Sequence, residues 1–125
     1  MEYRTTGTES QEQQTLFQWA AIKQRELPEL ALLHHIPNGG QRARTTAARL
    51  KAEGVKAGVP DLSLPVPRGN FNGLYVEMKV AKNKPTANQV WWLNALTQQG
   101  YCTAVCYSWQ EAANVIEKYL KSNKE

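Results

Sequence analysis

The chain has little cysteine, no long apolar run and no apolar segment at its beginning. Its two cysteines, Cys102 and Cys106, lack the second pair of ligands that a zinc site requires. No stretch approaches the roughly 20 apolar residues of a membrane-spanning helix. The first ten residues are polar and lack the apolar centre of a secretion signal. These absences predict a cytoplasmic protein whose cysteines are reduced and packed in the interior.

Charge of neither sign dominates the sequence. The 125 residues carry 15 Lys and Arg against 11 Asp and Glu, a formal net charge of +4. This mild excess is compatible with a nucleic-acid partner, although many basic proteins have none. A hydrophobic fraction of 42% is ordinary for a globular protein. The length predicts a single domain over residues 1–125, with residues 1–9 as a flexible lead-in.

Hydrophobic periodicity and turn signals predict helices that alternate with strands. The predicted helices cover residues 10–26, 41–53, 86–100 and 109–121, and the predicted strands cover residues 30–36, 61–66, 74–80 and 101–107. Thr8 and Ser10 are both candidate caps of the first helix, and Thr86 caps the third. The order αβαββαβα predicts an α/β fold, in which helices flank a mixed central β-sheet.

Two charged positions interrupt the apolar strand at residues 74–80. Side chains alternate along a strand, so Glu77 and Lys79 project from the same face. Together with Asp61, which follows a proline, Glu77 offers hard oxygen ligands for Mg²⁺ or Mn²⁺. A neighbouring lysine can orient a water molecule or stabilise charge on a phosphate. The pattern favours metal-dependent phosphodiester hydrolysis over the alternative of an ordinary ion pair on an exposed strand edge.

These residues resemble a known family. Gly58-Val59-Pro60-Asp61 with Glu77-Met78-Lys79 is similar to the motif of the PD-(D/E)xK nuclease superfamily, and to its VRR-NUC branch in the stand-alone form typical of phages and bacteria. The turn at residues 37–40, the lead-in at residues 56–58 and Gln89 also have counterparts in that branch. The resemblance covers roughly residues 9–120 and implies a restriction-endonuclease-like core.

The resemblance also implies a role for each residue of the motif. Asp61 and Glu77 would be metal ligands, joined by the backbone carbonyl of Met78. Lys79 would position or activate the attacking water, and Gln89 would line the active site. No Ser-His-Asp or Cys-His arrangement suggests a covalent intermediate, so hydrolysis would proceed by direct attack of water.

An acid on the first helix is a further metal ligand in this branch. Glu12 is preferred here, because it lies one turn before Leu16 and therefore at the edge of the buried stripe. Glu9, one turn earlier, is the alternative. An acidic first turn is also favourable for any helix, because it complements the helix dipole.

Several polar side chains are candidates for contacts with the DNA backbone. A glycine-rich turn before a helix exposes N–H groups to phosphate, and nearby basic residues attract a polyanion. Each of these residues has an equally ordinary interpretation as a solvated side chain or part of a tight turn. The candidates are Asn38, Arg42, Arg44, Lys56, Lys82 and Lys84.

The resemblance implies a structure-specific DNA endonuclease in a bacterial cytoplasm or in the cytoplasm of a phage-infected host. Stand-alone members of the branch are similar to enzymes of branched DNA, including four-way (Holliday) junctions. A homodimer would supply the two cuts that a junction requires. One of Trp91 and Trp92 must leave the apolar face of its helix, which suggests a subunit interface. The alternatives are a flap, nicking or general nuclease, and a non-catalytic nucleic-acid-binding module.

Overall fold

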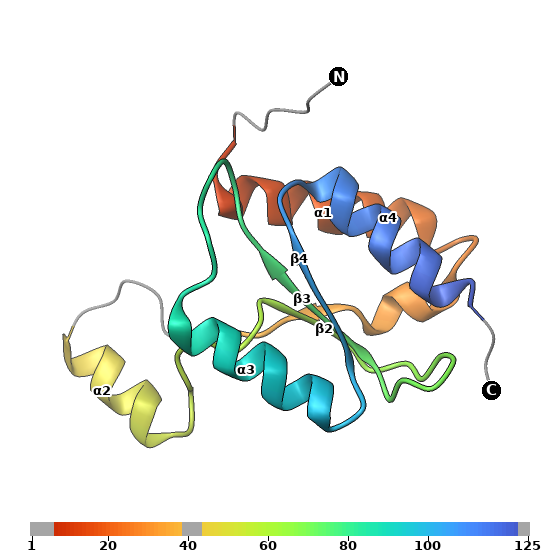
Figure 1. The fold of residues 1–125 in the computed structure, drawn as a ribbon. Coiled ribbons are helices and arrows are strands. Elements are labelled where there is room, and N and C mark those ends of the chain that lie inside the picture. Colours follow the sequence, from red (N-terminus) through yellow and green to blue (C-terminus); the bar gives the residue numbers. More distant parts are fainter. Residues whose placement is uncertain (1–6, 39–43, 123–125) are drawn as a thin grey trace.

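The computed structural model describes residues 7–38 and 44–122, which form a mixed β-sheet with helices on both sides (Figure 1). The helices are α1 (Glu9–Lys23), α2 (Arg44–Ala52), α3 (Ala87–Gln98) and α4 (Trp109–Leu120). The strands are β1 (His34–His35), β2 (Leu62–Leu64), β3 (Leu74–Met78) and β4 (Cys102–Cys106). Their order in the sheet is β1-β2-β3-β4, with β3 and β4 parallel and the other pairs antiparallel. The predicted α/β class and order of elements are therefore confirmed.

The beginnings of α1 and α3 are set by the same local motif. Thr8 and Thr86 each accept a hydrogen bond from the backbone of the residue three positions later, Gln11 and Gln89 respectively, whose side chains bond back. This reciprocal capping box satisfies N–H groups that a helix start otherwise leaves unpaired. It identifies Thr8 rather than Ser10 as the cap of α1. Residues 1–6 of the predicted lead-in lie outside the described residues.

The strand predicted over residues 30–36 is wrong in its first half. Pro28–Leu32 forms a short 3₁₀ helix, η1, and only β1 remains of the strand. Proline suits the first turn of a helix, where its missing N–H would have no intrahelical partner. Leu30 and Leu33 are both buried three residues apart, which is the 3₁₀ repeat. The proline at the first turn and the three-residue spacing of the buried leucines therefore favour a 3₁₀ helix over the strand that the apolar residues predict.

Other differences concern the ends of elements. Strand β2 is shorter than residues 61–66 because Pro65 and Pro67 have no N–H to donate to a neighbouring strand. The described part of the helix predicted over residues 41–53 is α2. Gly54 follows α2 with φ at +102°, a left-handed conformation that favours glycine and ends the helix as predicted.

The hydrophobic core lies between the sheet and the pair α1 and α4. Figure 1 shows these two helices side by side over one face of the strands, with α3 on the other side and α2 beyond it. Strand β3 directs Leu74, Val76 and Met78 into the core. Its alternate side chains, including Glu77 and Lys79, therefore face the α3 side. Among the described residues, no helix is both long enough and apolar enough to cross a membrane.

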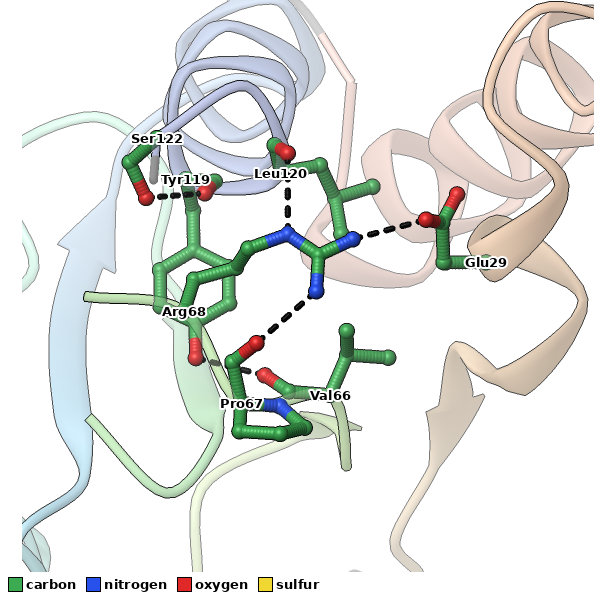
Figure 2. Close-up of polar contacts among 7 residues, drawn as sticks. All are labelled: Glu29, Val66, Pro67, Arg68, Tyr119, Leu120 and Ser122. Atoms are coloured by element: carbon green, nitrogen blue, oxygen red, sulfur yellow. Dashed lines mark hydrogen bonds and ion pairs between the residues drawn. The ribbon is translucent and has the colours of Figure 1, made fainter. Parts of the chain in front are cut away.

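A buried arginine closes the core at the beginning of β3 (Figure 2). Arg68 Nε donates to the carbonyl of Leu120 at 3.0 Å, and Nη1 donates to the carbonyl of Pro67 at 2.8 Å. Nη2 lies 2.7 Å from a carboxylate oxygen of Glu29. Tyr119 Oη donates to the carbonyl of Val66 at 2.6 Å. This Arg68 cluster joins the β2–β3 connection to the last turn of α4 and to η1.

Candidate active site

Asp61, Glu77 and Lys79 meet at the C-terminal end of β3. The register that pairs Leu62 with Val76 places Asp61 opposite Glu77 when it is continued by one residue. Directly opposed residues on antiparallel strands share a face, so the two carboxylates converge. Asp61 Oδ2 accepts a hydrogen bond from the Met78 N–H at 2.8 Å. Lys79 Nζ lies 3.7 Å from Glu77 Oε2. The structure thus brings together the acids and the lysine of the sequence motif.

The same end of β3 also directs a backbone oxygen toward Asp61. The Lys79 N–H donates to the carbonyl of Cys106 on β4. The intervening peptide is trans, so the Met78 carbonyl points to the opposite side, where Met78 N–H meets Asp61. Neighbouring chain segments therefore carry three oxygen groups that could bind a metal: the carboxylates of Asp61 and Glu77 and the carbonyl of Met78.

Burial raises the pKa of both acids. Glu77 is only 1% exposed, and this desolvation raises the pKa of its carboxyl to about 8, with a further upward contribution from Asp61 and an opposing one from Lys79. Burial also raises the pKa of Asp61, against the effect of the Met78 N–H. A site with two carboxylates held in this way is stabilised by any additional positive charge.

Gln89 orients the Glu77 carboxylate from the α3 side. Its Oε1 accepts from the Thr86 N–H at 2.8 Å within the capping box, which leaves Nε2 to donate to Glu77 Oε2 at 2.9 Å. Glu77 Oε1 is buried and has no hydrogen-bond partner among the described residues. A buried carboxylate oxygen without a partner is costly unless a cation binds it. The polar groups around Glu77 therefore leave one oxygen available to a ligand.

Close contact with the Gly58 turn brings α3 to the site. Asn88 Nδ2 donates to the carbonyl of Ala57 at 2.9 Å. Gly58 has φ at +91°, and a Cβ at this position would lie 2.9 Å from Asn88 Cγ. Only glycine accommodates both the conformation and the approach. The glycine of the Gly-Val-Pro-Asp motif thus allows the beginning of α3, and with it Gln89, to approach β3.

The two candidate acids of the first helix, Glu12 and Glu9, have different surroundings. Glu12 Oε1 accepts from the Trp109 N–H at 2.9 Å, so this buried carboxylate satisfies the beginning of α4. The charge of Glu9 contributes to the raised pKa of Asp61 and of Glu77. One oxygen of Glu12 is therefore engaged at the beginning of α4, and the choice between Glu12 and Glu9 as a metal ligand stays a prediction.

The oxygen ligands of the site are of the kind that the metal implied by the motif requires. Among residues 7–38 and 44–122, no three His, Cys, Asp or Glu side chains form a group that could hold a metal ion. Asp61 and Glu77 nevertheless converge, and Glu77 Oε1 is a buried acceptor without a partner in that part of the chain. Hard oxygen donors of this kind fit Mg²⁺ or Mn²⁺.

The predicted DNA-contacting residues are less closely grouped. Asn38 Nδ2 donates to the carbonyl of Val59 at 2.9 Å and so supports the segment that leads to Asp61. Arg42 lies outside the described residues. The remaining predicted contacts are exposed cations, on α2, before the Gly58 turn and in the loop after β3: Arg44, Lys56, Lys82 and Lys84.

The sequence analysis missed two residues that support the site. Asn88 and His35 donate hydrogen bonds to the backbone carbonyls of Ala57 and Asp61 respectively. A bond to a distant backbone carbonyl leaves no residue pattern, because any residue can supply that carbonyl. No signal in the sequence marks either role.

Comparisons with known proteins identify related domains. The sequence model of the VRR-NUC domain matches residues 4–110. A solved structure described as a VRR_NUC domain protein is similar to this chain with a TM-score of 0.81 and 30% sequence identity, over 96% of this chain and 93% of the other. No curated protein matches the sequence.

Proposed function

The chain belongs to the VRR-NUC family, and we propose that it is a metal-dependent endonuclease that hydrolyses phosphodiester bonds in branched DNA. The family itself indicates a nuclease-type domain. The observation that carries the proposal is Glu77 Oε1, a buried carboxylate oxygen without a partner in the described part of the chain, beside Asp61 and Lys79. A pure binding module has no need of such an arrangement, since phosphates are bound by cations and N–H groups.

The metal ligands would be Asp61, Glu77 and the Met78 carbonyl, with Glu9 in place of Glu12. A bound Mg²⁺ or Mn²⁺ would lower the pKa of water and neutralise charge on the phosphate. The protein prepares for this by holding Asp61 with the Met78 N–H and Glu77 with Gln89. Each contact uses one oxygen of its carboxylate, and Glu77 Oε1 has no partner in the described part of the chain.

Lys79 would act on the reacting groups directly. Its ammonium lies on the same face of β3 as Glu77 and is largely buried. A cation in a poorly solvated place interacts more strongly with a developing negative charge than one in water does. Lys79 would therefore donate a hydrogen bond to the attacking water or to a non-bridging phosphate oxygen.

Branched DNA is proposed as the substrate because the domain is small and its cations are dispersed. Lys56, Lys82 and Lys84 are exposed on segments that adjoin Gly58 and Lys79. Contacts of this kind fix the position of the phosphate backbone and carry no base sequence. Recognition would then depend on the shape of the DNA, with four-way junctions as the first candidate.

A second copy of the chain is proposed as the partner. Helix α2 has no buried residue, and Trp91 on the neighbouring α3 is 62% exposed. Between these helices lies a cavity of about 780 Å³, with Leu50, Val55 and Trp92 in its lining. An apolar surface rich in tryptophan is typical of subunit interfaces. The cavity also includes Asn88, so a dimer formed here would have each active site next to its interface.

The oligomeric state can be tested with one matched pair of variants. Light scattering during size-exclusion chromatography should give a dimer for the wild type and a monomer for Trp91→Glu. Ile22 on α1 is 75% exposed and lies on another helix, so Ile22→Glu should remain dimeric. A monomeric wild type, or a dimer that persists in Trp91→Glu, would contradict this interface.

The activity test compares a labelled four-way junction with a linear duplex of the same sequence, in Mg²⁺, in Mn²⁺ and in EDTA. We expect paired cuts on the junction, little cleavage of the duplex and no cleavage in EDTA. Lys79→Ala should abolish cutting and retain DNA binding. Equal cleavage of both substrates would indicate a general or differently targeted nuclease. Binding without metal-dependent cleavage would support the non-catalytic module instead.

A further inference from the structure

His35 contacts the backbone of Asp61 from the edge strand β1. Its Nδ1 lies 2.9 Å from the Asp61 carbonyl oxygen. A carbonyl can only accept, so Nδ1 carries the proton and donates. The Ile36 N–H donates to the same oxygen at 2.7 Å. Both lone pairs of the Asp61 carbonyl are therefore engaged by adjacent residues of the chain.

These bonds hold Asp61 at two places. Its carbonyl is bonded to His35 and Ile36, and its carboxylate is bonded to the Met78 N–H. Strand β1 contributes only two residues to the sheet, and both histidines are exposed. The imidazole of His35 therefore adds little buried apolar area. Its polar contact is the hydrogen bond to the Asp61 carbonyl.

We propose that His35 is a positioning residue, which fixes the backbone of Asp61 so that its carboxylate is held ready for a divalent cation. This inference rests on the proposed function, because it requires Asp61 to bind that cation. Groups that orient a ligand through a hydrogen bond typically change metal affinity by about 10-fold or more when they are removed. The role is exerted through Asp61 and needs no contact between His35 and DNA.

The tautomer argues against a direct contact with the substrate. With the proton on Nδ1, the other ring nitrogen, Nε2, is an acceptor. Phosphate oxygens are also acceptors, so neutral His35 has no donor to offer them. The observed hydrogen bond therefore favours the positioning role over phosphate binding.

Asparagine and glutamine separate the two roles of the ring. The amide nitrogen of Asn can occupy the place of Nδ1, whereas that of Gln reaches the place of Nε2. Binding of Mn²⁺ to the full-length protein, measured by calorimetry without DNA, should be about tenfold weaker for His35→Ala and His35→Gln. His35→Asn should bind within about twofold of the wild type, because it restores the donor to Asp61.

His34 provides the matched control. Its Nδ1 makes the same kind of bond, at 2.9 Å to the carbonyl of Leu32, which is not one of the acids of the site. His34→Ala should therefore leave Mn²⁺ affinity unchanged. Cleavage assays should show a higher Mn²⁺ requirement for His35→Ala, with KM for DNA unchanged.

The outcomes distinguish this inference from the proposed function. A wild-type protein that neither binds Mn²⁺ nor cuts DNA refutes the proposed function and the role of His35 with it. A wild type that does both, with His35→Ala binding Mn²⁺ equally well, overturns the role of His35 alone. Rescue by Gln in place of Asn, with a raised KM for DNA, would also overturn it and assign His35 to the substrate.

Discussion

Two buried charges lie at opposite ends of β3, and their surroundings differ. Arg68 is 5% exposed and Glu77 is 1% exposed. The guanidinium of Arg68 donates to two carbonyls and contacts the Glu29 carboxylate (Figure 2). Glu77 has Gln89 and Lys79 at one oxygen and no hydrogen-bond partner at the other among the described residues. Burial alone therefore does not distinguish a structural charge from a functional one.

The difference lies in whether the fold satisfies the charge. Removal of an ion from water is costly, and only close partners compensate for that cost. The Arg68 cluster supplies those partners, so it contributes to a well-defined native state. The Glu77 carboxylate is left short of partners, and its pKa rises to about 8. Such a perturbed group beside other acids is typical of a site that binds or reacts.

The largest expected effect comes from Glu77→Gln, which should remove function and increase stability. Loss of a ligand charge should reduce metal-dependent cleavage by about 10³-fold or more. The variant has no carboxylate to desolvate, so its free energy of unfolding in EDTA at pH 8 should exceed that of the wild type by on the order of 3 kcal/mol. Urea denaturation and junction cleavage measure the two effects.

The stability gained by Glu77→Gln should depend on pH, because the pKa of Glu77 is raised in the folded protein. The pKa of Glu77 is raised from 4.5 to about 8 in the folded protein, so the folded state binds more protons than the unfolded state between these values. Wild-type stability in EDTA should then fall as the pH rises from about 4.5 to about 8. The Gln variant should lose most of this decline and keep only the part that comes from the raised pKa of Asp61. Equal stability of the two proteins at pH 5 and at pH 8 would contradict the interpretation.

Arg68→Met should show the opposite combination. It removes the hydrogen bonds to the carbonyls of Leu120 and Pro67 and the ion pair with Glu29, which should lower the free energy of unfolding by about 3 kcal/mol. Mn²⁺ affinity of the folded protein should not change, because the Arg68 cluster lies at the other end of β3. Arg68→Lys keeps the charge but cannot make all three bonds, so its free energy of unfolding should lie between those of the wild type and Arg68→Met. A stable Arg68→Met protein would show that the cluster contributes little.

A smaller loss of stability is expected when a methyl group is added at Gly58. Gly58→Ala combines an unfavourable positive φ with a contact to Asn88, and should cost about 2 kcal/mol. Gly54→Ala is the matched control, since Gly54 has φ at +102° and nothing within 4 Å of an added Cβ, and should cost about 1 kcal/mol. Only Gly58→Ala should also reduce cleavage, through displacement of Gln89. Thermal denaturation and cleavage rates measure these effects. Equal losses of stability and of activity in the two variants would show that the close approach of α3 to Gly58 is unimportant.

The smallest effect is expected at Ala81, two residues after Lys79. Ala81 has φ at +54°, a conformation that disfavours side chains. Ala81→Gly relieves this strain but increases the conformational entropy of the unfolded chain. The free energy of unfolding should therefore rise by only about 0.5 kcal/mol. Ala31, exposed in η1, has no positive φ, and Ala31→Gly should destabilise. Loss of stability in both variants would exclude strain at Ala81.

Local features of the chain made much of the fold predictable. The capping boxes at Thr8 and Thr86 and the glycine after α2 act within one helical turn, so they can be recognised without a tertiary structure. The segment at residues 30–36 was misassigned because its leucines fit both a strand and a 3₁₀ turn, and packing decided between them. Glu77 and Lys79 are recognisable in the sequence because charge in an apolar strand is conspicuous, and Asp61 is recognisable because it follows Pro60 in the Gly-Val-Pro-Asp motif.

What the sequence by itself determined is the order of the elements and the presence of two acids and a lysine where β2 and β3 pair. Periodicity and capping encode these features, since each depends on residues a few positions apart. The tertiary structure decided the partner of the first-helix acid Glu12, whose carboxylate accepts a hydrogen bond from the N–H of Trp109, 97 positions away. It also decided that Arg68 is satisfied and Glu77 is not. Partners of that kind come from remote segments, and only the packed chain determines which of them meet.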